Sequence, residues 1–289
     1  MSSSLPHVLK SDLDFPEVGM HTFPFSSSAS FRIYSSTEPH NWKIGDLQKG
    51  LILVHNGTET VGEGTGFGVP VLVYSDETFF SGSSKVDVSK GDGPRTVCKE
   101  FVMDRVARNR FRNVTLENRI ARRFFTRLAD VYQKHPTFRF LTLKDLTGKM
   151  DVDTTFLKAS SKGKVVVTYT MDGPSVEVRA DFRDLQRRGL EKIFMLNEHG
   201  SRFFREYADS EGAELVDTAI GAWDGISAKW SCLKTLNGDF GFRLWKAENS
   251  ILRRGREFLK GSLDWVGLDY EVNPLMDVFE YVIEVLDVH

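Results

Sequence analysis

Two stretches near the end of the sequence, "DFGFRLW" and "DWVGLDYEV", place tryptophan beside charged side chains. Residues two apart on a strand share a face, so Arg243 lies beside Trp245 on the first strand. By the same alternation, Trp265, Asp269 and Glu271 share one face of the second strand. A sugar presents apolar C–H faces and many hydroxyl groups, which suit an indole ring flanked by carboxylates and a guanidinium. We therefore predict that these five residues converge on a sugar or polyol ligand. The alternative is a second buried layer, in which the tryptophans pack and the charges pair.

A polar stretch, "LNEHGSRFFREYADSEG", holds the candidates for acid–base chemistry. Glu198 and His199 both have side chains that could transfer protons to or from a sugar. Neighbours on a strand point to opposite sides, however, and a histidine that precedes glycine is typical of a turn. Glu198 and His199 are therefore catalytic candidates beside a simpler interpretation, in which His199 is a turn residue.

No motif for a metal, a cofactor or a catalytic nucleophile accompanies these residues. The sequence contains no C-x-x-C, no H-E-x-x-H and no G-x-S-x-G. Its two cysteines, Cys98 and Cys232, are far apart and carry no signature of a nucleophile. We expect no metal site and no cofactor.

Four glycines alternate in "GEGTGFGVPVLVYSDETFF", at Gly62, Gly64, Gly66 and Gly68. A dinucleotide fingerprint needs G-x-G-x-x-G at the start of a helix, and this spacing does not supply it. The glycines are followed by β-branched and aromatic residues, which predict a strand, a tight turn and a second strand. We expect a structural segment whose bare face admits another backbone or a flat ligand such as a sugar.

Positive charge is concentrated in residues 99–135, which carry ten basic and four acidic side chains in a chain of net charge −2. This segment could serve a non-enzymatic interaction module as a face for nucleic acid, an acidic polymer or a protein partner. The overall charge gives no general attraction to nucleic acid, and no aromatic side chain interleaves with Arg119, Arg123 and Arg127 for base stacking. These observations favour a solvated face, and we do not expect nucleic acid as a partner.

One amphipathic helix is predicted at residues 115–134. Apolar residues recur every four positions there, Thr115 is a suitable N-cap, and Pro136 ends the pattern. The rest of the chain has the two-residue period of strands. The expected strands are 31–34, 50–55, 71–74, 78–80, 97–111, 138–143, 152–158, 164–171, 175–182, 192–197, 203–207, 226–233, 240–245, 263–272 and 278–286. Residues 81–96 are predicted to be rich in turns.

These elements predict a mainly β fold, a large antiparallel β-sandwich of two packed sheets with the helix lying against it. A serine- and proline-rich N-terminal segment, residues 1–30, is expected to be partly loose, and residues 31–289 form a single domain. No signal peptide or apolar membrane span is evident, which favours a cytoplasmic protein without a membrane partner.

The order of the segments resembles the galactose-mutarotase-like β-supersandwich superfamily. The resemblance rests on the many short strands, the early glycine-rich hairpin, and the ending "LDWVGLDYEV" followed by "VFEYVIEVL". It implies a supersandwich fold and carbohydrate binding or processing, of the epimerase or lyase type if the protein is an enzyme. The histidine and glutamate motifs of the epimerases do not occur at matching spacing, so the resemblance assigns no catalytic residue here.

Overall fold

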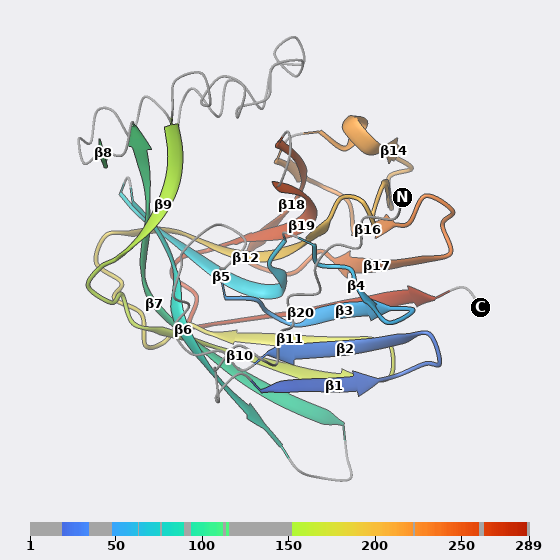
Figure 1. Cartoon of the computed structure of the whole chain (residues 1–289), viewed down its shortest axis with the longest axis horizontal. Coiled ribbons are helices and arrows are strands. Elements are labelled where there is room, and N and C mark those ends of the chain that lie inside the picture. Colours follow the sequence, from blue (N-terminus) through green and yellow to red (C-terminus); the bar gives the residue numbers. More distant parts are fainter. Residues whose placement is uncertain are drawn as a thin grey trace, which may run out of the picture.

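The computed structural model describes residues 19–34, 48–62, 64–75, 77–89, 94–111, 114–115, 152–221, 223–259 and 263–287. This part of the chain is built almost entirely of antiparallel strands, with one short 3₁₀ helix at Asp217–Ile220. Its strands form a small sheet of four and a large sheet of sixteen (Figure 1). Buried side chains from both sheets pack into one hydrophobic cluster. The predicted mainly β, antiparallel class is confirmed.

The small sheet is formed by the N-terminal part of the described chain. Its strands, in sheet order, are β1 (Met20–Pro24), β2 (Ala29–Tyr34), β3 (Ile52–His55) and β4 (Thr58–Glu59). Alternate residues of β2 are buried, as expected for a strand with one face on the core. Leu51, just before β3, forms an isolated antiparallel bridge with Phe67 and so connects this sheet to the large one.

The large sheet runs in the order β14–β13–β16–β17–β20–β11–β10–β7–β6–β5–β12–β19–β18–β15, with β8 and β9 paired to β7. Its strands are β5 (Gly66–Tyr74), β6 (Glu77–Val88), β7 (Arg95–Phe111), β8 (Val114–Thr115), β9 (Val152–Lys158), β10 (Lys164–Asp172), β11 (Ser175–Asp181), β12 (Leu190–Gly200), β13 (Glu206–Asp209), β14 (Glu214–Val216), β15 (Asp224–Ile226), β16 (Trp230–Lys234), β17 (Phe240–Trp245), β18 (Ser250–Leu259), β19 (Leu263–Val272) and β20 (Val278–Asp287).

The large sheet curls until strands from its two ends face each other across the core. The hydroxyl group of Tyr270 on β19 donates to the carbonyl oxygen of Trp245 on β17. Near the closing edge, the guanidinium carbon of Arg254 on β18 lies 4.7 Å from the centre of the Tyr207 ring on β13. A single sheet therefore supplies both opposing layers. The expectation of two large separate sheets was wrong in this respect.

The strand pattern explains where the core lies. In the β10–β11 hairpin, Val165, Val167 and Tyr169 are buried while the residues between them are partly exposed. The same alternation buries Phe240, Phe242 and Leu244 on β17 and Val266, Leu268, Tyr270 and Val272 on β19, as the sequence predicts. All of these side chains belong to one cluster, into which Phe31 and Leu53 of the small sheet also pack.

Several segments differ from the sequence-based expectation. The predicted strand 226–233 is divided between β15 and β16, and β1 forms within the N-terminal segment that was expected to be partly loose. The region predicted to be rich in turns, 81–96, is strand as far as Val88, because alternate residues of β6 pack toward the core. Strand β18 was not predicted, since its outward arginines and Gly255 hide the apolar alternation. The predicted helix at 115–134 lies outside the described residues apart from Thr115, which ends β8.

The described residues contain no helix with the length and apolar character that crossing a membrane requires.

Candidate functional site

The alternating glycines lie against the backbone of β12. A Cβ atom at Gly64 would stand 2.5 Å from the carbonyl oxygen of Glu198, and one at Gly62 would stand 3.1 Å from the Cα of Gly200. Gly68 has a φ of 74° and would place a Cβ 2.8 Å from the hydroxyl oxygen of Tyr169. The glycines thus admit close backbone approach, which favours the structural interpretation of this segment.

His199 is a core residue on β12. Its side chain is fully buried and lies among three phenylalanine rings, with centroid distances of 4.4 Å to Phe67, 5.0 Å to Phe242 and 5.5 Å to Phe204. Thr60 Oγ1 donates to a backbone carbonyl oxygen, so it accepts from Nδ1–H of His199 at 3.1 Å. The turn assignment of His199 is wrong, because the strand continues through residue 200.

Burial, with a smaller contribution from the charge of Lys49, lowers the pKa of His199 to about 3. The ring is therefore neutral at ordinary pH. Its Nε2 is buried and has no hydrogen-bond partner among the described residues. A side chain enclosed in this way cannot reach a ligand on the outside of the sheet, so His199 is a poor candidate for acid–base catalysis.

Asn197 joins the glycine segment to the outer strands. Its backbone N–H donates to Asp269 Oδ1 at 2.7 Å, and its Oδ1 accepts from the Gly68 N–H at 3.1 Å and the Tyr281 hydroxyl at 2.7 Å. Asp269 is only 4% exposed. Since one of its oxygens is already engaged by the backbone, Asp269 fixes the position of β12 against β19.

Trp223 lies across a pair of glycines on the outer face of β18 and β19. Gly255 and Gly267 are direct cross-strand partners. A Cβ at Gly255 would stand 2.3 Å from the indole ring of Trp223, and one at Gly267 would stand 2.9 Å from it. The ring therefore rests on bare backbone, which only glycine at both positions allows.

Two charged residues, Glu198 and Arg253, lie close to Trp223. A Cβ at Gly267 would stand 3.1 Å from the Glu198 Cγ, so the Glu198 side chain, which is 9% exposed, lies close to the same glycine as the indole. Thr65 Oγ1 donates to its carboxylate at 3.4 Å. Arg253 Nη2 donates to the backbone carbonyl oxygen of Trp223 at 2.7 Å. The Glu198 side chain thus lies against the same glycine as the indole ring, and the Arg253 guanidinium is bound to the backbone of Trp223.

Glu271 completes this arrangement, which we call the tryptophan face. Its carboxylate bonds Lys192 Nζ at 2.7 Å and Arg253 Nη1 at 3.4 Å, and Arg253 also lies over the Phe194 ring. Trp265 shares the same side of β19, and its Nε1 is buried with no hydrogen-bond partner among the described residues. The tryptophan face consists of Glu198, Trp223, Arg253, Trp265, Asp269 and Glu271.

Arg243 and Trp245 belong to a second arrangement, which we call the arginine ladder. Trp230 and Trp245 are cross-strand partners on β16 and β17. The guanidinium carbon of Arg243 lies 4.6 Å from the centre of the Trp230 ring and 5.8 Å from that of Trp245. Arg243 also pairs with Glu284 of β20 at 3.5 Å. Trp245 is 39% exposed, so one ring is open to solvent.

The five residues predicted to converge are found in two separate places. Seven strands lie between β17 and β19 in the sheet order. Because the apolar faces of both strands point into the same core, their outward faces point away from each other. Trp265, Asp269 and Glu271 are brought together, and Arg243 and Trp245 are brought together. The premise that same-parity residues of one sheet converge was wrong, because the sheet curls.

Trp223 and Arg253 are candidate site residues that were not predicted from the sequence. The available signal was the glycine in each of two neighbouring charged and aromatic strands, "ILRRGREFL" and "LDWVGLDYEV". A glycine inside a strand often marks the close approach of another group. Pairing these two glycines requires the register of β18 with β19, which the sequence alone does not supply.

The basic side chains that the structure describes in residues 99–135, which are Lys99, Arg105 and Arg108, do not form an exposed positive face. Lys99 is fully buried and donates to the carbonyl oxygens of Tyr34 at 2.8 Å and Lys49 at 2.6 Å. Burial lowers its pKa to about 7. Arg105 is 8% exposed, and Arg108 pairs with Glu77. Residues 112–113 and 116–135 lie outside the described chain.

The described residues hold no group of three or more histidine, cysteine, aspartate or glutamate side chains placed to bind a metal ion. The two outward faces instead combine indole rings with paired charges. Such surfaces can stack with a flat apolar group and exchange hydrogen bonds at its rim.

Comparison with known proteins gives only distant likenesses. No protein-family model matches the chain, and no curated protein sequence matches it. Among solved structures it is similar to the α-N-acetylgalactosaminidase NagBb from Bifidobacterium bifidum, solved with GalNAc, at a TM-score of 0.48 and 9% identity. That alignment covers 92% of this chain and 36% of NagBb, so the chain spans little more than a third of that protein's length. Slr1438 from Synechocystis sp. PCC 6803 gives a TM-score of 0.38 at 9% identity, with 94% of this chain and 96% of that one covered.

Proposed function

We propose that this protein binds carbohydrate on the tryptophan face. The supporting observation is the ring of Trp223, which lies flat on the glycine pair Gly255 and Gly267 and so forms a rigid platform. Pyranose rings stack their C–H faces on such platforms, because this apolar contact leaves the equatorial hydroxyl groups of the sugar free to form hydrogen bonds. The platform is held by backbone on one side and remains partly exposed.

The polar groups around the platform suit a neutral sugar. Arg253 and Glu271 are about three-quarters buried, with side-chain exposures of 25% and 22%, and already fix each other. A hydroxyl group can donate to Glu271 and accept from Arg253 without breaking that pair, since a carboxylate has several lone pairs and a guanidinium has five N–H groups. The arginine ladder, with Arg243 and Trp245, is a second and separate candidate platform.

We propose recognition without catalysis as the primary activity. Epimerase or lyase chemistry on a sugar needs an acid and a base on the same side of the ligand. Glu198 lies on the outer face, whereas His199 points into the core, and burial keeps His199 neutral. The large curled antiparallel sheet supports our placing the chain with the galactose-mutarotase-like β-supersandwiches. The histidine and glutamate motifs of the epimerases do not occur in this sequence at matching spacing.

Calorimetric titration with neutral hexoses, N-acetylhexosamines and uronic acids tests the proposal. We expect a neutral sugar to bind, and Trp223→Ala to weaken that binding by about 1–3 kcal/mol, the usual contribution of one stacking ring. Trp245→Ala is the matched control, because it removes an exposed indole from the other outward face. Binding that is lost in Trp245→Ala and kept in Trp223→Ala would move the site to the arginine ladder, and binding of no sugar at millimolar concentration would refute the function.

A further inference from the structure

The two ends of the large sheet are joined by a short length of chain rather than by paired strands. β14 and β15 are the end strands, and they are not paired with each other in the part of the chain that the structure describes. Residues 217–221 and Trp223 lie between these strands in the chain, and we call them the strap. The 3₁₀ helix at the start of the strap contacts β13 and β14 as well as β18, which belong to opposite ends of the sheet (Figure 1). The strap therefore crosses the line where the sheet closes.

A single carboxylate, that of Asp217, binds the strap to both ends of the sheet. Arg205, which precedes β13, donates to it through Nε at 2.8 Å and through Nη2 at 2.6 Å. Arg256 of β18 donates to the same carboxylate through Nη1 at 2.9 Å. The hydrogen bonds from Arg205 and Arg256 lower the pKa of Asp217 to about 2. The carboxylate is therefore ionised at ordinary pH, and charge-assisted hydrogen bonds reach it from both ends.

Strand β18 also holds the backbone of the strap. Arg254 Nε donates to the carbonyl oxygen of Ile220 at 3.2 Å, and the backbone N–H of Arg256 donates to that of Gly221 at 2.9 Å. The Ile220 side chain is fully buried in the common hydrophobic cluster. The far end of the strap, Trp223, is bound to the same strand through its own carbonyl oxygen. The strap is therefore fixed along β18 from its first turn to the indole.

The groups that hold the strap and the surface under the indole lie on opposite faces of β18. Arg254 and Arg256 alternate with Gly255, the glycine that the indole covers. Leu252, on the same side as the two arginines, is fully buried. The Arg254 guanidinium lies over Tyr207 of the opposing layer. A ligand stacked on the outer side of the indole therefore cannot touch these arginines.

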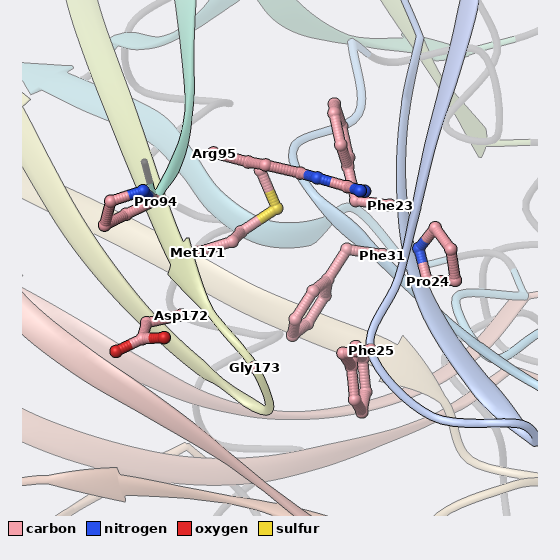
Figure 2. A pocket seen from close by; sticks show the side chains of 9 residues that line it. All are labelled: Phe23, Pro24, Phe25, Phe31, Pro94, Arg95, Met171, Asp172 and Gly173. Carbon is pink, nitrogen blue, oxygen red and sulfur yellow. The ribbon is translucent and has the colours of Figure 1, made fainter. Parts of the chain in front are cut away.

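The junction between the small and large sheets is held in a different way. Where the β1–β2 hairpin meets β10, Phe23 and Phe31 face Met171 across a groove (Figure 2). All three side chains are buried and belong to the common hydrophobic cluster. Apolar packing holds that junction, whereas charged side chains hold the strap. Removal of one charge should therefore loosen the strap while the apolar core stays packed.

We propose that Asp217 and Arg254 are positioning residues for the tryptophan face: by holding the strap across the closing line of the sheet, they seat the Trp223 ring on Gly255 and Gly267. They act through the strap and touch no ligand. This inference rests on the proposed function only for the sugar that the seated ring binds. By linkage, a ligand stacked on the seated ring also favours the closed strap.

A double-mutant cycle in two backgrounds tests the proposal. Trp223→Ala and Gly255→Ala, alone and together, are made in the wild type and in Asp217→Asn, and their urea midpoints are compared. Asparagine suits this position, because Asp217 has a φ of 49° and asparagine tolerates the left-handed conformation. We expect the two effects to be coupled in the wild type and additive in Asp217→Asn, because the ring no longer rests on residue 255. Arg254→Gln should abolish the coupling in the same way, and it decides the question if Asp217→Asn does not fold.

Glu59→Gln is the matched control. The Glu59 side chain is 26% exposed against 30% for Asp217, and it too accepts from an arginine and a second donor, Arg32 and Tyr34. Glu59 belongs to the small sheet, so its substitution should leave the coupling between the indole and residue 255 intact. Coupling that persists in Asp217→Asn would overturn the proposal. Coupling that disappears in Glu59→Gln as well would also overturn it, because general destabilisation would then explain the loss.

Sugar binding provides a second, independent measurement. If a neutral hexose or N-acetylhexosamine binds the wild type, calorimetry should find binding at least about tenfold weaker in Asp217→Asn and unchanged in Glu59→Gln. Equal affinity of the wild type and Asp217→Asn would overturn the proposal. If no sugar binds the wild type, the proposed function fails, and the mutant cycle still decides whether the strap seats the ring.

Discussion

The backbone of Gly64 lies against the backbone of Glu198, and a Cβ at residue 64 would stand 2.5 Å from the Glu198 carbonyl oxygen. Gly64 does not have a left-handed φ, so the constraint there is contact alone. We expect Gly64→Ala to lower the free energy of unfolding by about 1–3 kcal/mol, the usual cost of overpacking. Urea midpoints measure the change.

Gly225→Ala is the control for this prediction. A Cβ at Gly225 would meet only the Cγ2 of Ile251 at 3.0 Å, and Ile251 is an exposed side chain that can move aside. If the two variants were equally stable, the contact between Gly64 and β12 would not constrain the sequence.

His199 makes the stability of the fold sensitive to acid. Its pKa is lowered to about 3 in the folded state, against an ordinary value near 6.5, because burial disfavours the charged ring. Between these values the unfolded chain binds a proton that the folded chain excludes, so stability falls as the pH falls through this window, by up to about 1.4 kcal/mol per pH unit. His199→Leu should flatten this dependence between pH 6.5 and pH 3. Urea unfolding at several pH values measures this dependence. If the wild type and His199→Leu gave parallel profiles, the folded state would not hinder protonation of the His199 ring.

Lys99 gives a similar dependence at higher pH. Burial lowers its pKa to about 7 from 10.5, so above pH 7 the unfolded chain binds the extra proton. Stability should therefore rise from pH 7 to pH 10.5, again by up to about 1.4 kcal/mol per pH unit. In Lys99→Met this rise should be absent, as measured by the difference between the two unfolding profiles. Lys85→Met, whose side chain is 73% exposed in the wild type, is the control and should leave the profile unchanged.

Trp223 and Gly255 should be energetically coupled. A Cβ at Gly255 would lie 2.3 Å from the indole ring, so Gly255→Ala must displace the ring and destabilise the fold. In a Trp223→Ala background the same substitution meets no ring and should cost little. A double-mutant cycle of urea midpoints should give a coupling of about 0.5–3 kcal/mol, the range found for contacting residues. Additive effects would contradict the flat placement of the ring on β18.

Much of the fold could be predicted from the period of the sequence. The alternation in 164–182 predicts the β10–β11 hairpin, and the apolar faces of β17 and β19 lie where two-residue spacing puts them. The local sequence pattern does not predict the structure where pairing with strands distant in sequence determines it. Strand β12, for example, pairs with β5 on one side and β19 on the other, and these contacts keep its polar end, through Gly200, in strand conformation.

The candidate site was predictable only in part. Strand parity places Trp265, Asp269 and Glu271 on one face, and this grouping is present. It does not specify the curl of the sheet, which separates them from Arg243 and Trp245, nor the cross-strand register that seats Trp223 on two glycines. Parity also cannot distinguish a buried carboxylate such as Asp269, which is 4% exposed, from one available to a ligand.

The last strand of the large sheet, β20, occupies an interior place, between β17 and β11. Residues 278–287 therefore join the two halves of the sheet, and until the ribosome has made and released them each half ends in an unpaired edge. Completion of the fold must then follow synthesis of almost all of the described chain. During that interval the exposed edges of β11 and β17 can pair with other nascent chains. The yield of folded protein should therefore depend on how quickly residues 278–287 are synthesised, and on whether the two edges are protected until then.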